Sequence, residues 1–264
     1  MIQLFFLSLI FILSSGLFLY RYTGKKRFLK FDLVQFIYAF SIAPLVFVWT
    51  KTFVYYLLQS EAHLLGQTNL FIIDTAVSLL GLFVYSFVII HFITKNFEIR
   101  RYRDPLYDVF QLSEVIHLWI SHLGLYFFAL LVATVLSLLN VYFPLDVELS
   151  RVWFLALLPA GGLSGGVLFI AVWLSNFTKS KFMKINRLMF AFHFFAHLAM
   201  YFLLSIEFNM RFITYWFFFS CFLTTNILSI FFEKSQRLML IIDRWHHKHP
   251  DGWSGIHKKF NNPD

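Results

Sequence analysis

The sequence predicts an all-α integral membrane protein, a bundle of seven transmembrane helices with the N-terminus outside and the C-terminus in the cytoplasm. Three observations predict it: the apolar composition, the length of the apolar segments and the placement of the basic residues. Of 264 residues, 59% are hydrophobic and 14% are charged, and the mean hydropathy is +0.70. A soluble domain carries roughly a quarter charged residues, and a single water-soluble core does not bury this much apolar surface. We therefore expect lipid to be the solvent of this chain.

Seven apolar segments have the length that a bilayer requires, which is about 20 residues per helix. In chain order they are Gln3–Tyr20, Leu33–Trp49, Asn69–Thr94, Leu118–Phe143, Val152–Asn176, Leu188–Ile206 and Phe212–Phe232. Asp74 is the one formally charged residue inside them. Tryptophans such as Trp49 and Trp153 fall near segment ends, where the headgroup region favours indole rings.

The basic residues predict the orientation. The stretches that follow the first, third, fifth and seventh segments carry 19 of the 22 Lys and Arg residues, and the other three are Lys51, Arg151 and Arg211. Basic loops resist translocation and stay in the cytoplasm. Alternate loops are therefore cytoplasmic, and an odd number of spans puts the two termini on opposite sides.

The two ends of the chain fit this scheme. The first segment is expected to remain as a helix, because no positive residue precedes it, its apolar run is long and a basic stop follows at once. We expect two parts, the seven-span bundle of residues 1–232 and a basic amphipathic tail of residues 233–264. The segment 237–245 of the tail predicts a short helix at the membrane surface. The net charge of +8 then faces anionic lipid headgroups, and nucleic acid is not an expected partner.

Histidines are the most informative chemical feature. Five of the ten are expected at similar depth near the cytoplasmic ends of the third, fourth and sixth segments: His91, His117, His122, His193 and His197. All five are candidate metal ligands. His193 and His197 lie four residues apart, so both rings point to one helix face and can share an ion with His91 or His122. His117 and His122 lie five apart, about 140° around an α-helix, and are not expected to share one ion.

A haem is the alternative cofactor to a transition metal. One histidine from each of two helices can bind haem b axially, and the candidates are His91, His122, His193 and His197. Ionisable residues inside a membrane are costly, which is why we treat these histidines as functional candidates and not only as groups that hydrogen-bond carbonyls or headgroups. The single cysteine, Cys221, excludes a disulfide framework and a cysteine-based metal site within one chain.

Glycines mark a close helix contact in the fifth segment. Gly161, Gly162, Gly165 and Gly166 form two overlapping GxxxG pairs. A GxxxG pair lets another helix backbone approach closely. We therefore expect the middle of this segment to pack tightly against a neighbouring helix.

The same run contains Gly-Leu-Ser-Gly at residues 162–165. It resembles the GxSG nucleophile motif of rhomboid proteases, and the resemblance implies Ser164 as the nucleophile. That chemistry needs a histidine base at matching depth. His193 and His197 are expected nearer the inner boundary than Ser164, which favours the packing interpretation of this run.

Asp74 is expected about five residues below the outer face. It is a candidate for an ion path, and its alternatives are a pair with Lys51 or Arg211 and a protonated, hydrogen-bonded structural role.

Three functions remain open at this stage. The first is a redox or metal- or haem-binding membrane protein whose site is the histidine group. The second is a small transporter or channel that uses Asp74, and the third is a non-catalytic subunit or assembly factor of a membrane complex, with other membrane subunits as partners. Whether the chain is an enzyme is left open, and no P-loop, dinucleotide fingerprint or HExxH motif occurs. The expected location is the inner or plasma membrane of a cell, and an organellar inner membrane fits the same features.

Overall fold

The protein is described by a computed structural model for residues 2–23, 27–28, 31–59, 62–100, 115–145, 151–176 and 180–234. Within these ranges the chain is almost entirely helical. The α-helices are α1 (Ile2–Thr23), α2 (Leu33–Ile37), α3 (Ala43–Gln59), α4 (Ala62–Arg100), α6 (Leu123–Tyr142), α7 (Arg151–Asn176), α8 (Ser180–Leu204) and α9 (Ile213–Lys234). Two π-helices, η1 (Tyr38–Ile42) and η3 (Ile116–His122), and a short 3₁₀-helix, η4 (Met210–Phe212), complete the helical part.

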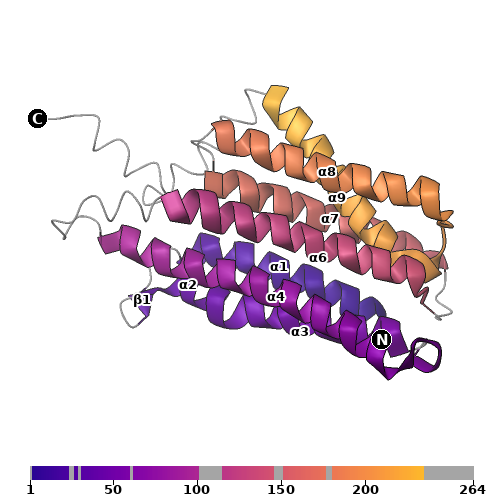
Figure 1. Ribbon diagram of the computed structural model, residues 1–264. Coiled ribbons are helices and arrows are strands. Elements are labelled where there is room, and N and C mark those ends of the chain that lie inside the picture. The colour runs from indigo at the N-terminus through magenta and orange to yellow at the C-terminus, as the bar shows by residue number, and fades with distance from the viewer. Residues whose placement is uncertain are drawn as a thin grey trace, which may run out of the picture.

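The long helices lie side by side, with α1 to α4 in one half of the bundle and α6 to α9 in the other (Figure 1). Among the described residues, six helical stretches are long and apolar enough to cross a membrane: Leu33–Gln59, Gly66–Lys95, Trp119–Tyr142, Arg151–Val172, Lys184–Leu204 and Met210–Phe231. These six confirm a helical membrane bundle. The first expected span is the helix α1, whose described apolar stretch, Phe5–Gly16, is shorter. The count of seven, the orientation and the division into bundle and tail stay predictions.

Three local features depart from the expected segments. A small antiparallel hairpin, β1 (Arg27–Phe28) and β2 (Phe31–Asp32), joins α1 to α2. Helix α8 starts at Ser180, eight residues before the expected segment, because polar residues continue the helix beyond the apolar run. Helix α4 changes direction at Gly66, whose φ of 71° lies in the left-handed region that favours glycine.

The glycine run of α7 packs against α9. A Cβ atom at Gly161 or Gly165 would overlap the backbone carbonyl of Phe217 or Cys221, so that only glycine permits this approach. Two hydroxyl groups of α9 lie at the contact. Ser220 Oγ donates to the carbonyl of Leu158 at 2.8 Å, and Thr225 Oγ1 lies between the carbonyl of Cys221 in its own helix, at 2.8 Å, and that of Gly165, at 3.1 Å.

Asn140 ties the end of α6 to the start of α9. Its Nδ2 donates to the carbonyl of Arg211 at 2.9 Å, and its Oδ1 accepts from the amides of Thr214 at 3.0 Å and Tyr215 at 3.4 Å. The side chain is fully buried and takes up backbone groups that the first turn of α9 leaves without intrahelical partners.

Helices α4 and α6 meet closely at the start of α6. A Cβ atom at Gly124 would overlap the ring of Phe87 on α4. This contact brings η3, which directly precedes α6, against the last turns of α4. The same end of the bundle carries the β1–β2 hairpin (Figure 1).

Candidate metal centre

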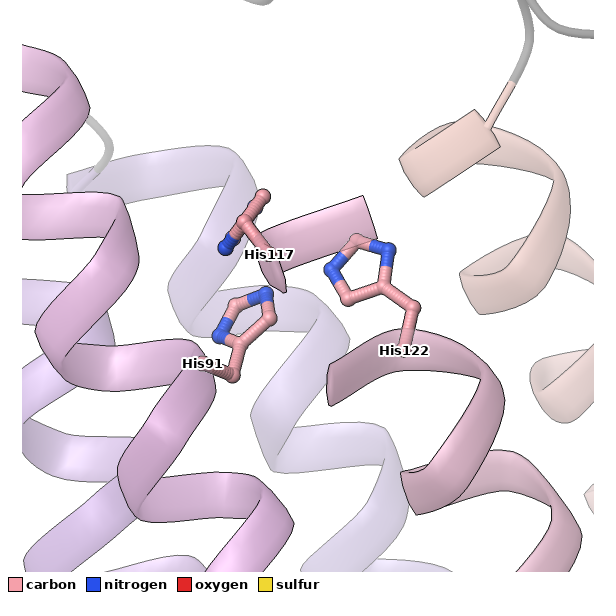
Figure 2. A group of neighbouring side chains, drawn as sticks. All are labelled: His91, His117 and His122. Carbon is pink, nitrogen blue, oxygen red and sulfur yellow. The ribbon is translucent and has the colours of Figure 1, made fainter. Parts of the chain in front are cut away.

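Three histidines meet where α4 packs against η3. His91 belongs to α4, His117 is the second residue of η3 and His122 is its last (Figure 2). Their ring centroids form a triangle with sides of 4.4 Å for His91–His117, 4.5 Å for His91–His122 and 4.7 Å for His117–His122. One nitrogen atom from each ring lies within 4.8 Å of the other two. His117 and His122 are buried and His91 is partly buried, so these rings converge inside the bundle.

The π-helix is the reason that His117 and His122 share a face. The expectation that these residues point about 140° apart assumed α-helical geometry, and it is wrong. A π-helix is closed by i→i+5 hydrogen bonds, so residues five apart lie nearly in line along it. Segment η3 has this conformation over Ile116–His122, and both rings turn toward His91.

Thr94 fixes the ring of His117. Its Oγ1 donates to the carbonyl of Ile90 at 2.7 Å and lies 3.0 Å from Nδ1 of His117. A hydroxyl group has one hydrogen and a carbonyl only accepts, so Nδ1 of His117 carries the proton and donates it to Thr94. The lone pair of the ring is then on Nε2. Metal-binding histidines have this arrangement, with one nitrogen hydrogen-bonded to a second group and the other on the metal.

The size of the triangle suits one small ion. A tetrahedral ion with metal–nitrogen distances of about 2.0–2.1 Å holds its nitrogens roughly 3.3 Å apart, which small rotations of the three rings would reach. A haem bound axially by two of these three rings would require them to move apart, and the haem alternative, for which His193 and His197 are also candidates, stays a prediction. Two axial imidazoles at similar iron–nitrogen distances have their centroids on the order of 6 Å apart, with the macrocycle between them. The centroid separations of 4.4–4.7 Å are those of rings in direct contact.

The structure does not bring His193 and His197 to this group. Nδ1 of His193 lies 2.8 Å from the hydroxyl of Thr134, and Nε2 of His197 lies 2.9 Å from that of Ser137. Thr134 lies about 18 Å farther along α6 than His122, at 1.5 Å per residue. The five histidines were expected at one depth and instead occupy two places, because α8 begins earlier than expected and carries His193 deeper into the bundle.

His193 and His197 also do not face one shared point. Nδ1 of His197 donates to the backbone carbonyl of His193 at 2.9 Å, so both nitrogens of His197 have hydrogen-bond partners. Nε2 of His193 is buried and has no hydrogen-bond partner among the described residues.

Asp74 pairs with Lys51, one of the partners expected for it. The Lys51 ammonium also lies 2.8 Å from Ser78 Oγ and 3.4 Å from the backbone carbonyl of Asp74. The side chains of Lys51 and Asp74 are 28% and 49% exposed, and they join α3 to α4 on the outer surface of the bundle. Arg211, the other expected partner, forms no described ion pair with Asp74.

Ser164 is buried at the α7–α9 contact. Its hydroxyl donates to the carbonyl of Ala160 at 3.0 Å, one turn earlier on the same helix. This back-bonding to the residue four positions before is common for serine inside a helix. The hydrogen bond gives Ser164 a local structural role of the kind that the packing interpretation expects.

Two features of the centre were not anticipated from the sequence: the role of Thr94 and the π-helix. The spacing His91-x-x-Thr94 is a signal that was present, because residues three apart share a helix face. The short helix expected at residues 237–245 lies outside the described residues.

Comparison with known proteins gives no relative for this chain. No model of a protein family, no characterised protein and no solved structure matches it. The geometry of the centre is therefore the basis for assigning a function.

Proposed function

We propose that this chain is a multi-pass membrane protein that binds one transition-metal ion through His91, His117 and His122. The observation that carries the proposal is the convergence of three imidazole nitrogens, from two packed helical elements, to within 4.8 Å of one another. Imidazole is a preferred ligand of zinc, copper, iron and nickel, and three histidines form a recognised zinc ligand set.

The environment supports a functional role for these rings. Ionisable groups are expensive inside a membrane and mark functional sites there. The three imidazoles lie in mutual contact and two of them are buried, so an ion at this point would be held by polar ligands inside an apolar bundle.

Three protein ligands leave a coordination position for a further group. Structural zinc sites are closed by four protein ligands, whereas catalytic sites keep one position for water or substrate. The proposed activity class is therefore Lewis-acid chemistry for zinc, or electron transfer for copper or iron, at one end of the bundle. A role as a subunit of a larger membrane complex is compatible with this metal site.

The alternative of a transporter or channel that uses Asp74 has less support. An ion path needs a carboxylate that is available to the passing ion, and the carboxylate of Asp74 pairs with Lys51.

The test is metal binding by the full-length protein in detergent. The chain is purified, stripped with a chelator and titrated with Zn²⁺ and Co²⁺, and bound metal is measured by elemental analysis. We expect one ion per chain. His122→Ala is expected to lower the affinity at least 100-fold, because it removes a direct ligand. His193→Gln is the matched control, a buried histidine of the same bundle, and is expected to bind as the wild type does.

Two results would contradict the proposal: a correctly folded wild-type protein that binds no stoichiometric ion, or equal affinities for wild type and His122→Ala. An absorption spectrum of the preparation before stripping tests the haem alternative, since a bound haem gives an intense visible band.

A further inference from the structure

The ion pair of Lys51 and Asp74 lies where a membrane protein seldom has charge. Each residue is eight positions from an end of its apolar stretch, Leu33–Gln59 or Gly66–Lys95, which is about 12 Å along a helix. The other Asp, Glu, Lys and Arg residues of the six stretches lie at an end or within one turn of it. Ionisable residues inside a membrane almost always face the bundle interior or a water-filled cavity. This pair instead lies on the surface of the bundle, with side chains 28% and 49% exposed.

The surface around the pair is apolar and exposed. Lys51 has Val48 and Tyr55 one turn to either side of it on α3, and these two side chains are 59% and 68% exposed. Phe71 lies one turn before Asp74 on α4 and is 70% exposed. Helix α4 is also the least covered of the six stretches, with 11% of its most apolar part buried. Two charges in the middle of such a surface face lipid unless a partner covers them.

The ammonium of Lys51 is turned toward α4 and not along the helix toward the headgroups. It bonds Oδ1 of Asp74 and lies 2.8 Å from Ser78 Oγ and 3.4 Å from the carbonyl of Asp74. A carboxylate can accept hydrogen bonds on both oxygens, and Oδ2 of Asp74 accepts none from the described residues. The exposed pair therefore retains an acceptor for a further cation.

We propose that a second copy of the chain covers this pair, so that the face of α3 and α4 around Lys51 and Asp74 is the interface of a homodimer. Helices α3 and α4 lie side by side (Figure 1), and the contact between the two residues places them at one depth. Two copies inserted in the same orientation are related by a two-fold axis along the membrane normal, and each presents the same face to the other. Such an axis places Lys51 of each copy opposite Asp74 of the other.

The charge pattern is the reason to expect a second copy. A face that carries one positive and one negative charge side by side is complementary to itself across a two-fold axis. Each ammonium and each carboxylate then has two opposite charges as neighbours, and Oδ2 of Asp74 gains a second cation. Intramembrane charges commonly pair with one another. The exposed apolar side chains around the pair, Val48, Tyr55 and Phe71, then surround the four charges and separate them from lipid.

The first test is cross-linking of the full-length protein in liposomes with a large excess of lipid. In a Cys221→Ala background, Phe71→Cys places a thiol on the proposed interface. Phe202→Cys is the matched control, because Phe202 is 72% exposed but belongs to α8 in the other half of the bundle (Figure 1). A short bis-maleimide reagent is added, and the products are separated by gel electrophoresis. We expect a covalent dimer for Phe71→Cys and only monomer for Phe202→Cys.

Charge exchange distinguishes pairing between copies from pairing within one chain. Asp74→Lys gives the face two positive charges and Lys51→Asp gives it two negative charges, so each variant alone is expected to be monomeric. Mixed before reconstitution, the two variants are expected to form a heterodimer, because each positive residue of one then faces a negative residue of the other. The pair within the chain is broken in both variants, so a role confined to one chain predicts no recovery. Two different affinity tags and co-purification after reconstitution measure the heterodimer.

The double exchange Lys51→Asp/Asp74→Lys is the control, because it restores both kinds of pairing and is expected to dimerise as the wild type does. Three results would overturn the proposal: a wild type that stays monomeric in lipid, equal cross-linking at positions 71 and 202, or variants of opposite charge that do not pair although the double exchange dimerises. If the single variants do not fold, the cross-linking decides. Zinc affinity is a separate question, since the interface does not rest on the metal site.

Discussion

Two pairs of elements in this bundle hold buried histidines next to a hydroxyl group, and they use them differently. At the α4–η3 contact, three imidazoles lie together, and the hydroxyl of Thr94 is hydrogen-bonded to Nδ1 of one of them, His117. At the α6–α8 contact, His193 and His197 each turn to a separate hydroxyl group, of Thr134 and Ser137. Burial is similar in both regions. What distinguishes the candidate site is therefore that nitrogen atoms from three rings lie within 4.8 Å of one another.

The largest expected difference between the two regions is in stability with metal bound. An ion that binds only the folded state raises the free energy of unfolding by about 2.7 kcal/mol at a free concentration 100 times its Kd. We expect this increase for the wild type and for His193→Gln, and none for His117→Ala. The measurement is thermal unfolding in detergent with and without Zn²⁺. The comparison between the regions breaks down if His193→Gln loses the stabilisation, because the α6–α8 histidines would then contribute to the ion site.

The next effect concerns the two threonines. Thr94→Val removes the acceptor that orients His117, and loss of such a supporting bond lowers metal affinity by about 10- to 100-fold. Thr134→Val makes the matching change at His193 and is expected to leave the affinity unchanged. The affinities are obtained from Co²⁺ titrations followed by absorption. Equal affinities in Thr94→Val and wild type would show that Thr94 does not position His117.

The apolar segments could be predicted from the sequence because they depend on local composition. His91, His117 and His122 were among the five candidate metal ligands, and their binding of a metal stays a prediction. A run of about 20 apolar residues that crosses a bilayer forms a helix, because only a helix satisfies its backbone hydrogen bonds within the segment. The grouping of His91 with His122 followed from their positions near the ends of adjacent segments. These inferences did not require knowledge of side-chain conformations.

The rest could not be predicted, for two physical reasons. The angle between His117 and His122 was derived from 100° per residue, and η3 departs from that geometry without a proline or glycine inside it. The depth of His193 was derived from the first apolar residue of its segment, Leu188. Helix α8 in fact begins at Ser180, and hydropathy does not register a helix that continues through lysines and arginines outside the hydrocarbon.

The smallest expected effect separates the two histidines of α8 from each other. Both nitrogens of His197 are hydrogen-bonded, whereas Nε2 of His193 is buried without a partner among the described residues. Side-chain hydrogen bonds between membrane helices are worth about 0.6 kcal/mol on average, and an unsatisfied buried polar group carries a penalty of about 1–3 kcal/mol.

His197→Leu is therefore expected to destabilise the protein by roughly 1 kcal/mol. His193→Leu, which removes one hydrogen bond and one unsatisfied nitrogen together, is expected to be neutral or stabilising. Unfolding in mixed micelles measures both variants, with zinc affinity as the control that neither should change. The reverse order of stabilities would mean that Nε2 of His193 has a partner in the membrane, such as a bound water. The α6–α8 region would then be a polar site of its own. It would bind water, whereas the α4–η3 centre is proposed to bind a metal ion.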